Sequence, residues 1–226
     1  MKKDLYLASR RNFLMSGIGA VLIAPKLRAD DDKVKNCPIT EDNIEGPFWL
    51  SDAPFRAKLR DDGQAGEVLI VSGKVEGFPG CIALKDAVID VWQANHSGHY
   101  DNEDSSHELA PKDFKLRGRM KASEQGAYEF ETVIPGAYKI SPKQFRPAHI
   151  HFKVSCPGYT PLTTQLYFKG DPYLEQDPWA KKSLIKELQK QENKEELKKR
   201  NLTQPFKTCT FDVVLKKLSK SSYGGD

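Results

Sequence analysis

Short apolar runs with strand character recur along the chain and predict an all-β fold. Most of them alternate apolar and polar residues or are rich in Val, Ile, Thr and Phe, as strands are. Turns containing Gly or Pro separate them, among them Pro135-Gly136 and Cys156-Pro157-Gly158. Many short strands divided in this way are typical of an immunoglobulin-like or transthyretin-like β-sandwich. The predicted strands span residues 68–75, 87–92, 116–121, 127–133, 149–154, 163–168 and 206–215.

One stretch, residues 178–200, departs from this pattern. It is rich in Lys, Glu, Leu and Gln, and Leu184, Ile185 and Leu188 would share one face of a helix. Charged pairs at i,i+4 spacing favour the same structure. These pairs are Glu195–Lys199 and Glu196–Arg200. The sequence therefore predicts a helical excursion near the C-terminus, at about 178–200, with its charges on a solvated face.

The N-terminus has the pattern of an export signal. Ser9-Arg10-Arg11-Asn12-Phe13-Leu14 is a twin-arginine motif, and an apolar run follows it from Phe13 to Pro25. This run is short for a membrane span and has no stop-transfer flank. Ala29 offers a small residue for cleavage. We interpret residues 1–29 as a twin-arginine-type signal peptide and expect the mature protein, residues 30–226, in the periplasm without a membrane segment.

Composition narrows the class of function. The 226 residues include 38% apolar and 29% charged residues, which is typical of a folded globular domain. The formal charge of +4 comes from the leader, because residues after Ala29 carry a net charge of −1. A near-neutral body gives no reason to expect nucleic acid as a partner.

The four cysteines have no C-x-x-C spacing, which argues against zinc-ribbon and thioredoxin sites. They are Cys37, Cys81, Cys156 and Cys209. An exported protein can form one or two disulfides, and four cysteines allow three full pairings. The spacing chooses none of them, and free buried thiols remain an equal alternative.

The strongest local signal for chemistry is Arg146-Pro147-Ala148-His149-Ile150-His151-Phe152. Residues two apart on a strand point to the same side, so His149 and His151 can bind one ion together. The H-x-H pattern alone also occurs at copper and zinc sites and in ordinary polar packing.

Two tyrosines change this interpretation. Tyr138 lies in the turn sequence Ile134-Pro135-Gly136-Ala137-Tyr138, and Tyr100 lies in Gly98-His99-Tyr100-Asp101. A phenol, with its ordinary pKa near 10, ionises at neutral pH only on a strong, hard Lewis acid. Iron(III) suits two phenolates and two imidazoles better than zinc or iron(II) does.

These motifs make the chain recognisable by resemblance. It resembles the intradiol ring-cleavage dioxygenases through E-G-P-F-W, A-V-I-D-V-W-Q-A-N with G-H-Y, I-P-G-A-Y, R-P-A-H-I-H-F and T-Q-L-Y-F-K-G-D-P, from about Glu45 to Phe168. The likeness is closer to the protocatechuate 3,4-dioxygenase type than to catechol 1,2-dioxygenases, whose long helical N-terminal segment has no counterpart in these residues. All four positions that hold iron in the family are Tyr or His here.

The resemblance implies a site and a reaction. Tyr100, Tyr138, His149 and His151 would hold Fe(3+), and a catechol-type aromatic diol would be cleaved with O2 between its two hydroxylated carbons to a muconate-type diacid. Tyr138 would take one proton of the diol and leave the metal, while Tyr100 and the histidines stay bound. The iron would act as Lewis acid and template. Family members form dimers or larger complexes, so a homo-oligomer is expected.

Further residues match the family's motifs with less specific roles. Arg146 would stabilise negative charge on the substrate ring, and Gln165 matches a glutamine near the iron that supports it. Gly46 and Pro47 match a segment that approaches the substrate pocket and also suit a simple turn. The loop histidines His96, His99 and His107 are expected outside the site.

Two competing interpretations share the sandwich fold. One is an exported binding module that holds copper or zinc through H-x-H, and the other is a transthyretin-like or carbohydrate-binding sandwich without a metal. Both require Tyr100, Tyr138 and Arg146 to be incidental, and neither predicts a coloured ferric protein.

Overall fold

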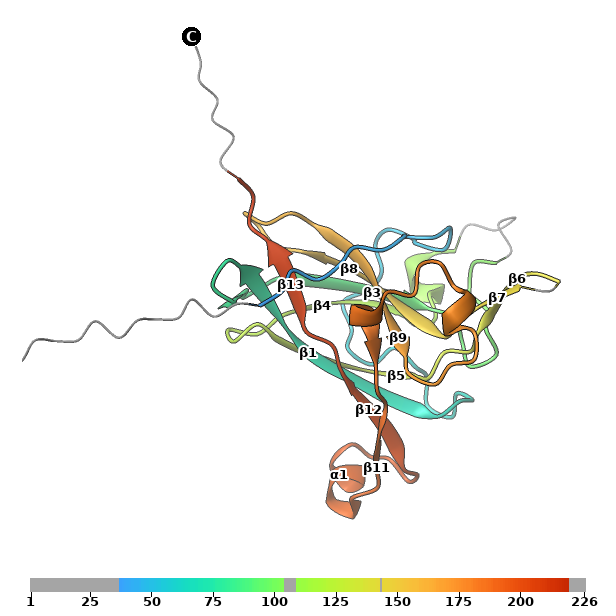
Figure 1. Ribbon diagram of the computed structural model, residues 1–226. Coiled ribbons are helices and arrows are strands. Elements are labelled where there is room, and N and C mark those ends of the chain that lie inside the picture. Colours follow the sequence, from blue (N-terminus) through green and yellow to red (C-terminus); the bar gives the residue numbers. More distant parts are fainter. Residues whose placement is uncertain (1–36, 104–108, 143, 220–226) are drawn as a thin grey trace, which may run out of the picture. The chain divides into compact units, whose positions relative to one another are not determined.

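A computed structural model describes residues 37–103, 109–142 and 144–219 and confirms the predicted all-β sandwich. The signal peptide, the linker after it and His107 lie outside these residues. Figure 1 shows the order of the elements along the chain. The strands are β1 (Val68–Phe78), β2 (Ile82–Ala83), β3 (Val88–Gln93), β4 (Arg117–Lys121), β5 (Ala127–Val133), β6 (Tyr138–Ser141), β7 (Gln144–Arg146), β8 (His149–Ser155), β9 (Leu162–Phe168), β10 (Ile185–Lys186), β11 (Gln189–Gln191), β12 (Phe206–Thr210) and β13 (Val213–Lys216), and the helices are α1 (Lys194–Lys199) and 3-10 turns at Pro111–Asp113, Leu174–Gln176 and Lys182–Leu184.

Two sheets enclose the core. One has the order β11-β12-β1-β13, with β2 and β5 also paired to β1, and the other has the order β10-β9-β8-β3-β4. Aromatic side chains meet between them: the Phe152 ring of β8 lies 5.9 Å from that of Phe130 on β5 and 4.9 Å from that of Phe211. This apolar interior fixes the side-chain register of β8, because a slip of one residue would move the apolar set to the other face.

The predicted last strand, 206–215, is two strands with a break between them. β12 pairs with the first half of β1 and β13 with the second half, both in parallel. At the break, a Cβ on Gly73 would lie 2.1 Å from the Phe211 carbonyl oxygen, so only glycine allows this close backbone approach. Phe211 itself is buried in the core.

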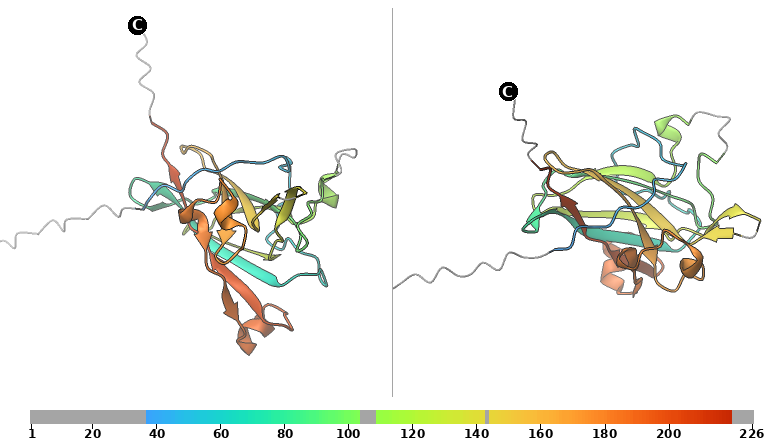
Figure 2. Two further views of the ribbon diagram at one scale, coloured as in Figure 1. Left: turned by 45° about the vertical axis from the view of Figure 1, so that its right-hand side comes forward. Right: turned by 45° about the horizontal axis from the view of Figure 1, so that its top comes forward.

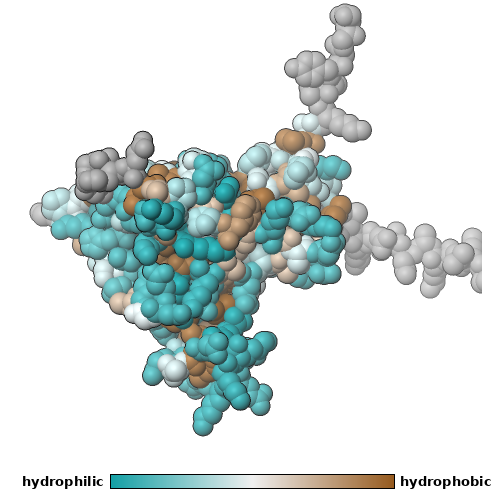
Figure 3. Space-filling model, turned by 180° about the vertical axis from the view of Figure 1, so that it is seen from behind, coloured by the Kyte–Doolittle hydropathy of each residue, from teal (hydrophilic) through white to brown (hydrophobic). Residues whose placement is uncertain are grey.

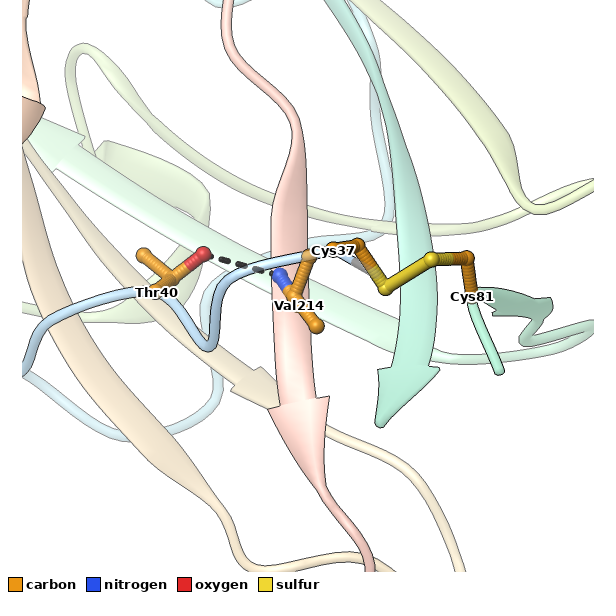
Figure 4. Close-up of a disulfide and its surroundings, with 4 residues drawn as sticks. All are labelled: Cys37, Thr40, Cys81 and Val214. Atoms are coloured by element: carbon orange, nitrogen blue, oxygen red, sulfur yellow. Dashed lines mark hydrogen bonds between the residues drawn. A yellow bond between two sulfur atoms is a disulfide. The ribbon is translucent and has the colours of Figure 1, made fainter. Parts of the chain in front are cut away.

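An N-terminal segment, residues 37–60, ties the sheets together. The Cys37–Cys81 disulfide fastens its start beside β1, and Thr40 exchanges hydrogen bonds with Val214 of β13, as Figure 4 shows for the bond to the Thr40 hydroxyl. Further along, backbone bridges join Phe55 to β4 and Lys58 to β5. The sequence left the disulfide pairing open. In the structure Cys37 is bonded to Cys81, and Cys156 and Cys209 are free thiols.

The predicted helical excursion is confirmed as a helix near the C-terminus, but its extent of 178–200 is wrong. Only Lys194–Lys199 is α-helical, capped by the Asn193 side chain, which accepts from two backbone N–H groups. The residues before it form short strands instead: β10 pairs with β9 and β11 with β12. Free sheet edges and burial of Leu184 in the core outweigh the helix propensity of this stretch.

The helix carries a solvated face, as predicted. None of its residues is buried. Figure 3 shows a largely hydrophilic surface over the part of the molecule that holds α1. Within the described residues, no helix is long and apolar enough to cross a membrane.

A hairpin that the apolar pattern missed carries part of the site. β6 and β7 pair with each other alone, and Figures 1 and 2 show them projecting beyond the two sheets (yellow). Tyr138 lies opposite Arg146 in their register.

Candidate metal centre

Strand β8 brings two imidazoles together. His149 and His151 point to the same side of the sheet and are almost completely buried. Their Nε2 atoms lie 3.1 Å apart. Two nitrogens that each bind one ion at about 2.1 Å in perpendicular directions lie about 3.0 Å apart. The pair therefore has the spacing of two ligands of one metal.

The tautomer of His149 leaves its Nε2 free to bind. Its Nδ1 lies 2.6 Å from the Pro147 carbonyl oxygen, which can only accept, so Nδ1 carries the proton. Burial lowers the pKa of His149 to about 3, and the charge of Arg146 acts in the same direction. Burial also lowers the pKa of His151. Both rings are neutral at pH 7 and can offer lone pairs to a cation.

His151 is held by packing. Its ring stacks on Trp92 of β3, with the centroids 4.7 Å apart and the planes 6° from parallel. Its Nδ1 is buried without a hydrogen-bond partner in the described structure. A Cβ on Gly46, whose φ is +71°, would approach the ring to 3.5 Å. The Gly46 turn therefore does reach the site, as the motif suggested.

Both predicted tyrosines lie at these histidines. The Tyr100 hydroxyl is 3.4 Å from His149 Nε2, and the Tyr100 ring stands perpendicular to that of Tyr138 at a centroid distance of 5.7 Å. The Tyr138 ring is 6.0 Å from that of His149. Tyr100 is buried, whereas Tyr138 is half-buried. The structure thus brings together all four predicted ligands.

The protein environment alone keeps both phenols protonated. Burial raises the pKa of Tyr100, and Tyr138 raises it further, against the charges of Arg146 and Arg117. Burial likewise raises the pKa of Tyr138. Only a strongly Lewis-acidic ion would make these groups phenolates. Two phenols and two neutral imidazoles fit iron(III), whose hardness suits anionic oxygen donors.

Arg146 lies beside the histidines in a buried network. One terminal nitrogen is 3.4 Å from His149 Nε2, and Nε donates to Asp177 at 2.9 Å. The other terminal nitrogen donates to Gln165 Oε1 and to the Tyr167 hydroxyl, both at 2.8 Å. The guanidinium also lies 4.9 Å from the Trp179 ring centroid. These contacts fix the cation at the edge of the ligand set.

Gln165 supports Arg146 and contacts no predicted ligand in the described hydrogen bonds. It stands opposite His151 in the β8–β9 register. Its Oε1 accepts from Arg146 and, at 2.6 Å, from Tyr167, and its Nε2 donates to the Ile44 carbonyl at 2.7 Å. Gln165 thus connects the arginine to the N-terminal segment.

Sequence reasoning missed several residues of the site. Phe48 stacks on Tyr100 at 4.1 Å, and Trp92 stacks on His151. Asp177 and Trp179 hold Arg146 from a loop that the predicted helix partly covered. Tyr167 had a usable signal, because it follows Gln165 by two positions on one strand and so shares its face.

Two of the loop histidines, His96 and His99, lie outside the ligand set, as expected. His99 contacts Glu103 at 3.0 Å, and His96 contacts the Ser97 hydroxyl. Both are solvent-exposed loop contacts rather than parts of the buried cluster.

Comparison with known proteins identifies relatives of this site. The family model described as "Dioxygenase" matches residues 44–217. A catechol 1,2-dioxygenase 2 of Acinetobacter lwoffii is 38% identical over 154 residues, 61% of this chain and 54% of the relative. A 6-chlorohydroxyquinol 1,2-dioxygenase of Cupriavidus pinatubonensis is 34% identical over 66% of this chain and 56% of its own length. The chain spans about half the length of these curated relatives.

Solved structures share the fold as well. The dioxygenase domain of a dioxygenase and carbohydrate-binding protein fusion from Streptomyces sp. SirexAA-E is 32% identical, covers 80% of this chain and 100% of that chain, and gives a TM-score of 0.64. Catechol 1,2-dioxygenase of Acinetobacter radioresistens is 30% identical over 87% of this chain and 68% of that chain, with a TM-score of 0.73. The closer likeness to protocatechuate 3,4-dioxygenases stays a prediction, since three of these four relatives are named as 1,2-dioxygenases and the fourth only as a dioxygenase.

Proposed function

The chain belongs to the intradiol ring-cleavage dioxygenase family, and from this membership we propose that it cleaves a catechol-type aromatic diol with O2 to a muconate-type diacid at a non-haem iron(III) centre. The convergence of two buried imidazoles and two phenols, with the Nε2 atoms of the histidines 3.1 Å apart, is the observation that carries this proposal. The names of the relatives support a dihydroxylated aromatic ring as substrate.

The iron would be held by the phenol oxygens of Tyr100 and Tyr138 and the Nε2 atoms of His149 and His151. When bound, it supplies Lewis-acid activation of a chelated diol toward O2. The chain's own groups bind and orient the ring, take up one of its hydroxyl protons and balance its charge. Their positions give each of them a distinct task.

Tyr138 is suited to exchange places with the substrate. It is half-buried at the start of the projecting β6–β7 hairpin, whereas Tyr100 is buried and stacked against Phe48. In its ionised form, the Tyr138 oxygen would accept a proton from one hydroxyl of the diol and become a neutral phenol. Tyr100 would keep its place, because it is buried and its ring stacks on Phe48, which does not move in this exchange.

Arg146 is suited to stabilise negative charge on the bound ring. Its charge is fixed by Asp177, Gln165 and Tyr167, so no reorganisation is needed when charge develops nearby. Asp177 balances this cation, which lets it remain buried.

The visible absorption spectrum of iron-replete protein tests this function. We expect a charge-transfer band from tyrosinate to iron(III) that moves to longer wavelength when catechol, hydroxyquinol or protocatechuate is added without oxygen. A band that does not move with any of the three diols would support the iron centre but contradict the proposed class of substrate. A colourless protein that retains copper or zinc would instead support a metal-binding sandwich without dioxygenase activity.

The location and assembly of the protein belong to the same proposal. The twin-arginine pattern supports export to the periplasm, with cleavage near Ala29, and the family resemblance supports a homo-oligomer. The N-terminal sequence of protein recovered from the periplasm tests the first expectation, and sedimentation of that protein tests the second.

A further inference from the structure

A second buried arginine lies behind the metal centre. Arg117 of β4 is 1% exposed and stands opposite Trp92 in the β3–β4 register. A buried guanidinium is stable only when its donors are paired. Its Nε donates to both carboxylate oxygens of Asp101, at 2.8 and 3.0 Å, and a terminal nitrogen donates to Asn102 Oδ1 at 2.7 Å. The other terminal nitrogen donates to the Phe48 carbonyl.

These partners come from the two segments that place Tyr100. Asp101 and Asn102 directly follow Tyr100 in its loop, and Phe48 stacks on the Tyr100 ring with the planes 15° from parallel. The Asp101 carboxylate also accepts from the Lys115 N–H, which ties the loop to the chain entering β4. One guanidinium therefore joins the loop after Tyr100 to the backbone of Phe48, the residue whose ring packs on Tyr100.

Tyr100 needs such support more than the other buried ligands do. His149 and His151 lie within β8, a central strand paired on both sides. Tyr100 lies in a loop, where its N–H bonds the Glu103 side chain at 2.8 Å and His99 bonds Asn95 through the backbone. Loops hold a functional side chain less rigidly than strands, so neighbouring contacts must set its position.

We propose that Arg117 is a positioning residue for the metal centre: by its hydrogen bonds to Asp101, Asn102 and Phe48, it holds the Tyr100 oxygen where it would bind iron(III). This inference rests on the proposed function of the site. Arg117 makes no described hydrogen bond to Tyr100, Tyr138 or either histidine, so it positions Tyr100 through its partners, in addition to the effect of its charge on the Tyr100 pKa. Changes to such supporting contacts typically lower metal affinity by about 10- to 100-fold.

The chain offers a matched control on the same strand. Arg119 follows Arg117 by two positions and so shares its face of β4. It also braces the N-terminal segment, by donating to the Ala53 carbonyl and by lying 4.8 Å from the Phe55 ring centroid. Its described hydrogen bonds do not reach the Tyr100 loop. Arg119→Gln should therefore destabilise the fold without disturbing Tyr100.

The experiment compares Arg117→Gln, Arg119→Gln and the unchanged full-length protein. Thermal unfolding of the metal-free form measures the stability of the fold. The iron(III) affinity and the charge-transfer band measure whether the metal centre is intact. For Arg117→Gln we expect about 10-fold weaker iron binding or more, with a shifted or weakened band. For Arg119→Gln we expect lower stability and an iron affinity within about 2-fold of the unchanged protein.

A second variant keeps the test decisive if Arg117→Gln does not fold. Asn102→Ala removes one acceptor of Arg117 and a weak donor to the Phe48 carbonyl, without leaving a carboxylate unpaired. It should weaken iron binding and shift the band in the same direction as Arg117→Gln. If a folded Arg117→Gln or Asn102→Ala variant kept the same charge-transfer band and iron affinity, this inference would be overturned and the proposed function would still stand. A colourless unchanged protein would overturn the proposed function and this inference with it.

Discussion

The two tyrosines of the centre have the same functional group but different surroundings. Tyr100 is buried in its loop, and Tyr138 is half-buried on the hairpin. We predict that Tyr138→Phe keeps most of the iron but lowers kcat by about 100-fold or more, because it removes a proton acceptor. Tyr100→Phe should instead lose iron, although its ring can still stack on Phe48. Iron content and oxygen uptake with catechol distinguish the two, and equal losses of iron would show that both tyrosines serve only as fixed ligands.

Asp90, which is not one of the predicted metal ligands, makes a pH-dependent contribution to the stability of the fold. Burial raises its pKa from 3.8 to about 6, against the Trp49 N–H bond and the charges of Arg119, Lys153 and Arg117. The folded state thus binds the proton more tightly than the unfolded state. The contribution of Asp90 to the stability of the fold is therefore greatest below pH about 4 and falls as the pH rises toward 6. Above that pH, the ionised carboxylate lowers the stability by at most about 3 kcal/mol.

From this sign we predict that Asp90→Asn is more stable than the unchanged protein at pH 7, by about 1 to 2 kcal/mol after the lost charge contacts are allowed for. The difference should disappear near pH 4. Urea unfolding of both proteins at several pH values measures it. Asp52→Asn, at an exposed turn, is the control and should show little change. A difference in stability that stays constant at every pH would show that ionisation of the Asp90 carboxyl is not its cause.

Among individual residues, the metal ligands can be predicted from the sequence more readily than the residues that hold them in place. H-x-H on a strand places two imidazoles together by a purely local rule, and the structure follows it. Asp177 meets Arg146 across 31 residues, and Phe48 meets Tyr100 across about 50. No periodicity encodes contacts between a loop and a distant residue, so these supports become visible only in the folded chain.

The elements show the same division between local and distant information. Strands such as β5, whose burial alternates, could be predicted because one face meets the core. Residues 178–200 could not, because their helix propensity is local while the edges that recruit β10 and β11 belong to β9 and β12. Only from Asn193 onward, where a capping side chain is available and no strand pairs, does the local preference prevail.

At the scale of the whole molecule, the N-terminal segment connects the disulfide to the metal centre. It begins at Cys37, bonds β13 through Thr40 and β9 through Asn43, and then supplies the Ile44 carbonyl to Gln165. The ring of Phe48 lies just beyond. This order means that the disulfide closes a loop of chain that includes one wall of the centre.

We therefore predict that Cys37→Ser/Cys81→Ser is less stable than the unchanged protein by about 3 to 4 kcal/mol, since the bond spans 44 residues and restricts the unfolded chain. Urea unfolding of metal-free protein measures the loss, and Cys156→Ser, at a free thiol, is the control. Thiol labelling adds an independent readout: protein from an oxidising compartment should show two reactive cysteines on unfolding, and protein kept in a reducing cytosol four. Equal stability of the double variant and four thiols in the exported protein would contradict the pairing, and the N-terminal segment would then be held at the centre by hydrogen bonds and packing alone.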